Sequence, residues 1–286
     1  ASFPLQDMGE ARLICDEMCV VVERAMNDTV ASVQSMALYA AGNLAQSLRE
    51  EAVPLVVNPL VFSRLMLRVR DLMEDRDDKV TGNAIRSVAH AVCLLLREDH
   101  SAAFKNTTVE PRTFLNSVMK SLSTRIRLCI LLASGGKSER SWKERTAIKR
   151  HGWGASNSLA TIFSDIVIDD EVVEECQDAV AALVECMETL QVVHGKVALS
   201  AMAALRSVQP RSLSRLSGKT ALVGRAVIAC LVHNTVDHDM LDYSNEKISR
   251  ELNVVLLHLL QSCSIADAHS VLLSDSITAA HLGYLY

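Results

Sequence analysis

Aromatic, proline and glycine residues are scarce in this sequence. Phe, Trp and Tyr together make up 4% of its 286 residues, and it contains five prolines and eleven glycines. So few prolines and glycines exclude collagen-like and low-complexity character. In contrast, 49% of the residues are hydrophobic, which is ample for a large buried core. Helix pairs that pack through Ala, Leu, Val and Met need few aromatic residues, so this composition is compatible with a helical protein.

The sequence also lacks an excess of positive charge and any long apolar run. Its formal net charge is −5 at pH 7, which argues against a dedicated nucleic-acid-binding protein. There is neither a signal peptide nor a stretch of about 20 apolar residues of the kind that spans a bilayer, so we expect no membrane insertion. Because the sequence begins with Ala and ends in the apolar HLGYLY, we expect it to be part of a longer polypeptide.

Motifs for catalysis and cofactor binding are absent or incomplete. There is no Gly-x-Ser-x-Gly nucleophile elbow. The Gly-Lys-Ser sequence 136–138 resembles the end of a phosphate-binding loop, but Leu131 stands where that loop needs its first glycine. The histidine of the Asp-His-Asp sequence 237–239 is explained by a solvated turn, because zinc sites take three or four ligands at defined spacing. We therefore predict a non-enzymatic protein with no catalytic residues, no metal ligands and no cofactor.

The eight cysteines do not form the pattern of a disulfide framework. Disulfide-rich proteins are short secreted chains with closely spaced cysteines. Four of the cysteines here lie inside apolar helical runs, where a cysteine acts as a small hydrophobic residue: Cys93, Cys129, Cys186 and Cys230. We therefore expect a reduced, intracellular protein in the cytoplasm, with the nucleus as the alternative location.

What the sequence does contain is a repeated helical phrase. Residues 78–96 carry one apolar stripe at three- and four-residue steps, which predicts an amphipathic helix. The phrase occurs five times. Its first predicted buried position holds Val33, Val80, His151, Val197 and Ile248. The position four residues later holds Ala37, Ala84, Ala155, Ala201 and Leu252. The position eight residues later holds Ala41, Val88, Leu159, Leu205 and Leu256. Small residues at one position let a neighbouring helix approach closely, and larger ones fill the space beyond.

The spacing of these copies predicts the domain organisation. Successive copies are 47, 71, 46 and 51 residues apart, and a period in the forties suits repeats of two or three helices. We predict one all-α superhelix, an α-solenoid over residues 1–286, with about five helical repeats. The predicted repeats are 9–50, 59–97, 111–167, 170–208 and 219–260. The third contains an inserted loop at 134–145, and a C-terminal helix is predicted at 265–282.

The repeated phrase resembles the second helices of HEAT and armadillo repeats. The segments 32–44, 78–92 and 195–208 carry this resemblance, and the phrase is also similar to repeats of the HEAT repeat-containing protein 6 family. Asp28 and Asp75 match the aspartate that HEAT units carry in the turn between their helices. The arginine that such units carry inside the second helix is replaced in every copy, so the choice between HEAT and armadillo stays open. Helical-repeat metallohydroxylases use His-Glu dipeptides, which this sequence lacks.

The resemblance implies where a partner would bind. Second helices of such repeats line the concave side of a solenoid, so their non-core residues are candidates for partner contacts: Tyr39, Asn43, Asn83, Arg86, His90 and Asn157. A long polar groove suits extended peptides or another protein's surface. Trp153 and Asn157 resemble one of the Trp-x-x-x-Asn pairs with which import receptors hold basic peptides, but the other repeats lack the pair. We therefore predict a scaffold or adaptor for a protein or peptide partner.

Two basic segments, 137–150 and 206–225, give an alternative. The first contains a run of cations near two tryptophans: Lys137, Arg140, Lys143, Arg145, Lys149 and Arg150. Such a run can contact phosphates while an aromatic ring stacks on a base, or it can meet an acidic protein segment. A solvated loop and helix start is the interpretation of this run that we favour. Binding of a nucleic acid through these two segments therefore stays the second interpretation.

Overall fold

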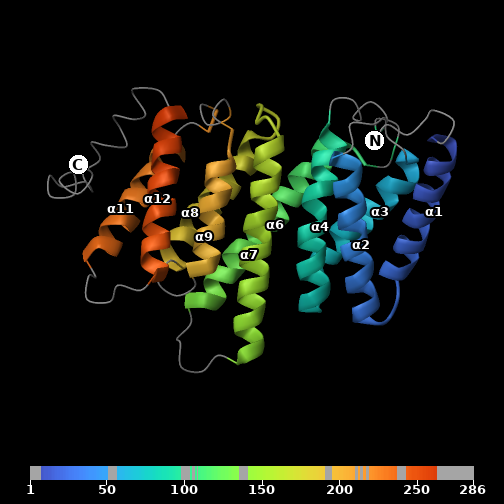
Figure 1. Cartoon of the computed structure of the whole chain (residues 1–286), viewed down its shortest axis with the longest axis horizontal. Helices are drawn as coiled ribbons and strands as arrows, with labels where there is room; N and C mark the ends of the chain where they lie inside the picture. The colour runs from blue at the N-terminus through green and yellow to red at the C-terminus, as the bar shows by residue number, and fades with distance from the viewer. Residues whose placement is uncertain are drawn as a thin grey trace. The chain divides into compact units, whose positions relative to one another are not determined.

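The structure is a computed structural model, drawn in Figure 1. It describes residues 8–50, 57–97, 104, 107, 109–134, 141–190, 195–209, 212, 215–216, 219–236 and 243–262. Every regular element within these residues is a helix, with ten α-helices and one short 3-10 helix. The predicted all-α class is therefore confirmed. The chain forms two compact units, residues 1–121 and 122–286. Within the described residues, no helix is both long enough and apolar enough to cross a membrane.

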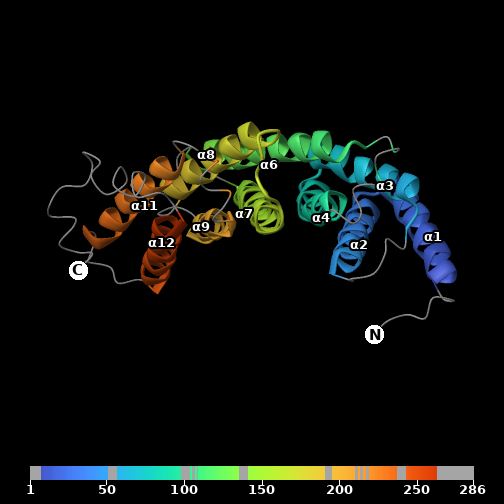
Figure 2. The same ribbon diagram turned by 90° about the horizontal axis from the view of Figure 1, so that it is seen from above.

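The first unit is built from two helix pairs. They are α1 (Met8–Met26) with α2 (Ala31–Glu50), and α3 (Pro59–Asp71) with α4 (Asp78–Leu96), where the 3-10 helix η1 (Leu72–Glu74) precedes α4. Helix α6 (Pro111–Ser134) begins in this unit. Within the unit, α2 packs on α4 and α1 packs on α3, which gives two layers (Figure 2). The structure thus has α4 at the residues that the sequence predicted, 78–96.

Local side-chain contacts explain where these helices begin. Asp28 Oδ1 accepts a hydrogen bond from the backbone N–H of Val30 at 2.8 Å, and Asp75 Oδ1 does the same for Asp77 at 2.8 Å. The two aspartates stand at equivalent points of the first two predicted repeats. Asp77 then caps α4, since its Oδ1 accepts from the N–H of Lys79 and of Val80.

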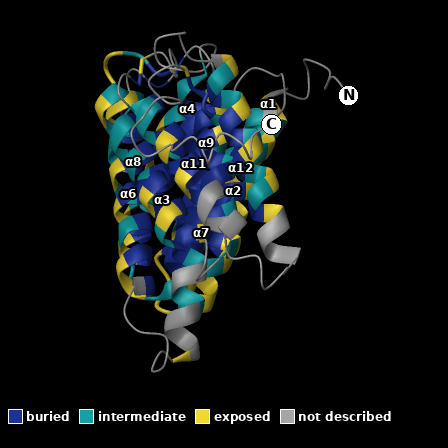
Figure 3. Cartoon of the chain, turned by 90° about the vertical axis from the view of Figure 1, so that its left-hand side faces the viewer, coloured by how far each residue is buried: buried dark blue, intermediate teal, exposed yellow. Residues whose placement is uncertain are grey.

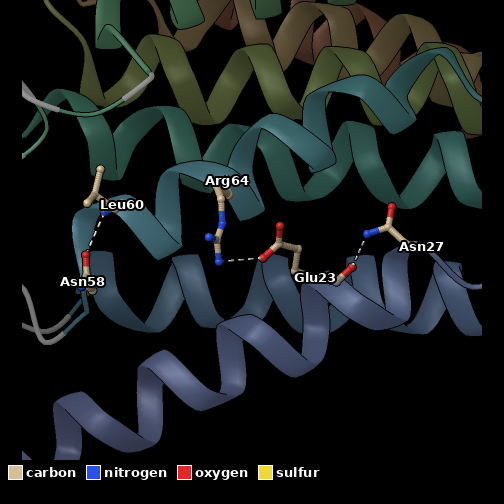
Figure 4. Close-up of polar contacts among 5 residues, drawn as sticks. All are labelled: Glu23, Asn27, Asn58, Leu60 and Arg64. Carbon is tan, nitrogen blue, oxygen red and sulfur yellow. Dashed lines mark hydrogen bonds and ion pairs between the residues drawn. The ribbon is translucent and has the colours of Figure 1, made fainter.

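The start of α3 is set in the same way. Asn58 Oδ1 accepts from the N–H of Leu60 at 3.0 Å, and Pro59 occupies the first helical position, where its missing N–H costs nothing (Figure 4). The backbone N–H of Asn58 donates to Asp16 Oδ1 of α1 at 2.6 Å, which ties the start of α3 to the first helix.

Helices α2 and α4 approach each other closely. A Cβ atom at Gly42 would lie 2.6 Å from Ser87 Oγ and 3.1 Å from Ser87 Cα, so only glycine fits there. The buried Ser87 Oγ lies 2.6 Å from the carbonyl oxygen of Leu38, to which it donates. Asn83 Nδ2 donates to the carbonyl and hydroxyl oxygens of Ser35 at 2.9 and 2.7 Å. These contacts fix the register of the second helices in the first unit.

The second unit repeats this organisation. It contains the rest of α6, then α7 (Trp142–Asp165), α8 (Val173–Leu190), α9 (Gly195–Ser207), α11 (Lys219–Val236) and α12 (Tyr243–Ser262). Helices α7, α9 and α12 pack side by side in one layer, and α8 packs on α11 in the other (Figure 2). The partners α8 with α9 and α11 with α12 also contact each other. Close approach recurs, because a Cβ at Gly152 of α7 would lie 2.7 Å from Val197 Cγ1 of α9.

Burial follows the predicted stripe with one exception. Buried residues lie on the helix faces that meet other helices (Figure 3). The second and third predicted positions are buried in all five copies, and the first is buried in four of them. The prediction is wrong for Val33, which is 38% exposed. Val33 lies at the end of the first unit, where the described residues provide no further helix to cover it.

One predicted boundary also needs correction. The inserted loop at 134–145 is too long, because α6 ends at Ser134 and α7 already begins at Trp142. The polar Trp-Lys-Glu-Arg sequence there suggested a loop, but Lys, Glu and Arg are good helix formers. Residues 135–140 and the C-terminal helix predicted at 265–282 lie outside the described residues.

The contact between α2 and α4 predicts a large effect from one methyl group. Gly42→Ala should lower the free energy of unfolding by about 1–3 kcal/mol, since Ser87 and its helix must move away. Urea denaturation followed by circular dichroism measures this change. The matched control is Gly9→Ala on α1, where nothing lies within 4 Å and the variant should be as stable or up to ~1 kcal/mol more stable. Equal stability of the two variants would contradict the close approach.

Candidate protein-binding face of the second helices

A stripe of four positions recurs on the second helices; it faces outward in the first unit, whereas Gly154 and Ser200 at two of its positions in the second unit are buried. The four positions lie one residue before the first buried position and three, six and ten residues after it. In the first unit this second-helix stripe consists of Ser32, Met36, Tyr39 and Asn43 on α2, and of Lys79, Asn83, Arg86 and His90 on α4. Five of these eight residues are the sequence-predicted candidates of this unit. Tyr39, Asn43 and Arg86 are exposed, and Asn83 and His90 are half-buried.

The half-buried members of the stripe also hold helices together. Asn83 donates to Ser35 of α2, as described above, and His90 Nδ1 lies 3.3 Å from Arg49 Nη1 of α2. The guanidinium of Arg97 donates to the carbonyl oxygen of Arg49 at 2.6 Å. Two guanidinium groups therefore lie at the ends of α2 and α4. The candidates Tyr39 and Arg86 are exposed on neighbouring helices of this unit.

In the second unit the stripe runs over α7, α9 and α12. The sequence-predicted Asn157 and Arg150 lie on α7 and are half-buried, and Trp153 between them is 42% exposed. Thr161 Oγ1 donates to the backbone carbonyl oxygen of Asn157 at 3.1 Å. This hydrogen bond does not involve the side-chain amide of Asn157. Lys196 on α9 and Lys247 on α12 are exposed at the equivalent of Arg150.

A cation recurs at the first stripe position. Four of the five second helices carry Lys or Arg directly before the first buried position, and the residues there are Ser32, Lys79, Arg150, Lys196 and Lys247. The three lysines are exposed. The sequence analysis did not single out these lysines. The alignment of the repeats contains them one residue before the first buried position. Equivalent residues on neighbouring helices of a layer lie side by side, so within each unit these cations share one face.

Local helix electrostatics do not explain these lysines. The N-terminal end of a helix carries a partial positive charge, and a cation there is unfavourable by about 0.3–1 kcal/mol. Asp77 and Asp78 offset this cost beside Lys79. Lys196 is the second residue of α9, and the first turn of that helix contains no acid. A cation that opposes the local preference is a candidate for a functional residue.

The two basic segments are less uniform than their sequence suggests. Lys137 and Arg140 lie outside the described residues, and Lys143, Arg145 and Lys149 lie on α7, where their side chains are not described. In the segment 206–225, two cations form ion pairs with acids of other elements. Arg206 Nη1 lies 3.1 Å from Glu251 Oε2, and Arg215 Nη1 lies 3.0 Å from Asp170 Oδ1. These carboxylates reduce the positive potential of the second segment.

The cysteines are placed as core residues rather than as reactive groups. Of the seven in the described residues, six are buried and Cys15 is half-buried, and none forms a disulfide. Burial raises the pKa of Cys19, Cys129 and Cys176 to about 12. Burial also raises the pKa of Cys186, with Cys129 adding to the shift. The described residues contain no group of three or more His, Cys, Asp and Glu side chains arranged to hold a metal ion.

The chain matches no protein-family model, no curated protein and no solved structure. Its function therefore has to be argued from the faces and contacts of its helices.

The buried thiols predict a strong contrast in reactivity. With a pKa of about 12, roughly one thiol in ten thousand is a thiolate at pH 8, and the thiolate is the nucleophile. Iodoacetamide at pH 8 should therefore label the half-buried Cys15 first and leave Cys19, Cys129 and Cys176 unmodified until urea unfolds the chain. Peptide mass mapping over time measures this order. Labelling of Cys129 as fast as that of Cys15 would contradict the burial described here.

Proposed function

We propose that this protein is a non-enzymatic scaffold, an α-solenoid of the HEAT or armadillo kind, that binds protein segments along its second helices. Two features support the solenoid. Helices pack in pairs and in two layers within each unit, and the turn aspartates Asp28 and Asp75 make the same hydrogen bond at equivalent points. Each unit of a solenoid contacts its neighbours and leaves one long face available to a partner.

One observation carries the binding function, namely the cation at the first stripe position. Lys79, Lys196 and Lys247 are exposed at equivalent places of three second helices, and Arg150 is half-buried at a fourth. Packing of the core does not require a positive charge at an exposed position that recurs from helix to helix. Within the second unit, an extended segment that crosses α7, α9 and α12 meets such a residue once per helix. The partner of best fit is therefore an extended polypeptide rich in Asp and Glu.

The exposed neighbours of these cations fit a peptide better than a small molecule. Tyr39 is 53% exposed on α2, and Trp153 is 42% exposed on α7. Large rings with a polar atom are typical anchors at protein interfaces. The stripe lies on outward helix surfaces of each unit, where Asn43 and Arg86 are also exposed. A reduced intracellular compartment agrees with this proposal, since none of the cysteines in the described residues forms a disulfide.

Charge reversal on the stripe tests this function. The triple variant Lys79→Glu, Lys196→Glu and Lys247→Glu should bind a fluorescein-labelled peptide of twelve glutamates at least tenfold more weakly, because exposed ion pairs contribute about 0.2–1 kcal/mol each and repulsion replaces them. Fluorescence anisotropy measures the Kd. A glutamate near the start of α4 and α9 suits the helix dipole, so loss of binding is not expected to come from unfolding.

The matched control moves the same charge off the stripe. Arg12→Glu, Lys120→Glu and Arg225→Glu change exposed cations of α1, α6 and α11, and the net charge of the two triple variants is identical. This control should change the Kd less than twofold. Equal losses in the two variants would mean that net charge alone attracts the peptide. If the peptide does not bind to the unmodified chain, the proposal of an acidic partner segment is wrong.

The exposed ring of Trp153 supports a second candidate, binding of single-stranded nucleic acid. It lies on the same helix as Lys143, Arg145, Lys149 and Arg150 of segment 137–150, and base stacking on an aromatic ring contributes about 1–3 kcal/mol per base. On this alternative, Trp153→Ala should weaken binding of a twelve-nucleotide RNA by about tenfold or more and leave the glutamate peptide unaffected. The ion pairs of Arg206 and Arg215 reduce the positive potential of the second basic segment, which makes the nucleic acid the second candidate.

A pull-down from cell lysate with and without nuclease separates the two candidates for natural partners. Protein partners that survive nuclease and are lost with the stripe variant support the scaffold. Partners that disappear with nuclease, together with binding that falls steeply as salt rises, support the nucleic acid.

A further inference from the structure

The first helix pair exposes an apolar surface beside the second-helix stripe, with which it shares Met36. This end face consists of Leu13, Ile14, Met18 and Val21 on α1 and of Val33, Met36 and Ala40 on α2. Leu13, Ile14, Met18 and Val21 are 66%, 52%, 48% and 62% exposed, and Met36 is 67% exposed. The neighbouring Val20 and Val30 are also exposed, at 37% and 51%. A contiguous exposed apolar patch of this kind is typical of a surface on which another protein packs.

The second helix pair shows what normally covers such a face. Shifting the sequence by the 47-residue step aligns Met18 with Leu65, Val33 with Val80 and Ala40 with Ser87. Leu65, Val80 and Ser87 belong to α3 and α4, and they are 0%, 0% and 4% exposed. Helices α3 and α4 pack on α1 and α2. Met18, Val33 and Ala40 therefore occupy repeat positions that a neighbouring helix pair covers, whereas Leu60, the equivalent of Leu13, is 56% exposed on α3.

We propose that the end face binds a helical hairpin, stacked in the register with which α3 and α4 pack on α1 and α2. The contact face of this hairpin is apolar, to match Met18, Val33 and Met36. At Ala40 it presents a glycine or another small residue, because the equivalent Ser87 packs against Gly42, where a Cβ would lie 2.6 Å from the hydroxyl.

The charge of the occupant follows from one ion pair. Arg64 Nη2 of α3 lies 3.4 Å from Glu23 Oε2 of α1, as the close-up shows (Figure 4). The residue equivalent to Arg64 on α1 is Glu17, which is exposed on the end face between Leu13 and Val21. This position therefore carries a negative charge on α1 and a positive charge on α3. The hairpin therefore carries Lys or Arg at the place that Glu23 occupies in α1.

The same glutamate argues against a second copy of this chain. Glu17 is the middle residue of α1, which spans Met8–Met26. Two copies that pair symmetrically through this face would bring one Glu17 against the other at the centre of the contact. Like charges in an apolar contact are unfavourable, whereas a hairpin with a cation there removes the conflict.

A tandem duplication in the full chain tests the proposal. Repeating residues 4–50 directly before residue 4 inserts 47 residues and keeps the spacing of the first two repeats. In the added copy, Glu23→Arg supplies the cation, and Met18→Lys with Met36→Glu gives it a polar outer face. These substitutions also distinguish the peptides of the two copies by mass. Hydrogen exchange of the native α1 and α2 is compared with that of the unextended chain.

The extension should slow exchange of amides in the native α1 by at least tenfold and raise the Tm by several degrees. Two controls accompany this measurement. An added copy that keeps Glu23 should protect α1 less, since two glutamates then meet. In the other control, the native chain carries Met18→Lys and Val21→Glu, and the extension should give no protection. Both residues are about half exposed, so these changes should leave the melting of the unextended chain unchanged.

Two results would overturn the proposal. One is exchange of α1 that the extension leaves unchanged. The other is sedimentation of the unextended chain as a dimer that becomes a monomer when it carries Met18→Lys and Val21→Glu. In that case the end face would bind a second copy of the chain. Neither result bears on the second-helix stripe, whose residues on α4, α9 and α12 are untouched by these variants.

Discussion

The close packing of second helices is the constraint on which the rest of the structure depends. At Gly42 and Ser87 two helix backbones meet so tightly that a single added carbon has no room. The same requirement explains the small residues four positions after the first buried position of α2, α4, α7 and α9, where Ala37, Ala84, Ala155 and Ala201 are buried. Once neighbouring second helices lie this close, their first helices are drawn into a second layer that covers the remaining apolar side.

This packing also decides which residues face outward. A helix with neighbours on both sides and a first helix behind it has one narrow strip left, as on α4, where Lys79 and Arg86 are its exposed residues. Because the register of packing repeats, the register of the outward strip repeats too. A recurring cation is then a property of the layer rather than of one helix. Asn83 and His90 show that polar residues on this strip also stabilise the packing through Ser35 and Arg49.

Much of this structure could be predicted from the sequence, because its signals are local. Residues 78–96 form α4 as predicted, since Asp77 accepts from two backbone N–H groups and an apolar stripe follows it. The failures come from information that a single repeat does not contain. Met18 and Leu65 occupy equivalent positions and have similar side chains, yet Met18 is 48% exposed and Leu65 is fully buried. The difference depends on whether another helix pair packs on that side.

The candidate site was predictable to a similar extent, and for the same reason. Tyr39, Asn43 and Arg86 were found because the helix period separates outward from inward positions. The lysines at 79, 196 and 247 were missed because each is unremarkable alone and is significant only beside its equivalents on packed helices. His151 illustrates the opposite case, since a polar residue predicted at a buried position is indeed 6% exposed. Its place in the repeat was a better guide to burial than its chemistry.

The stripe and the end face differ in the physics by which they would hold a partner. Lysines in contact with water attract an acidic segment through charge, and salt at physiological concentration screens charges over about 8 Å. The end face excludes water from apolar side chains, which is largely independent of salt and scales with the area covered. It contains one conspicuous charge, Glu17, and that charge selects an occupant more than it strengthens the contact. A scaffold with both surfaces can therefore keep a permanent helical neighbour at one end while it exchanges charged segments along its second helices.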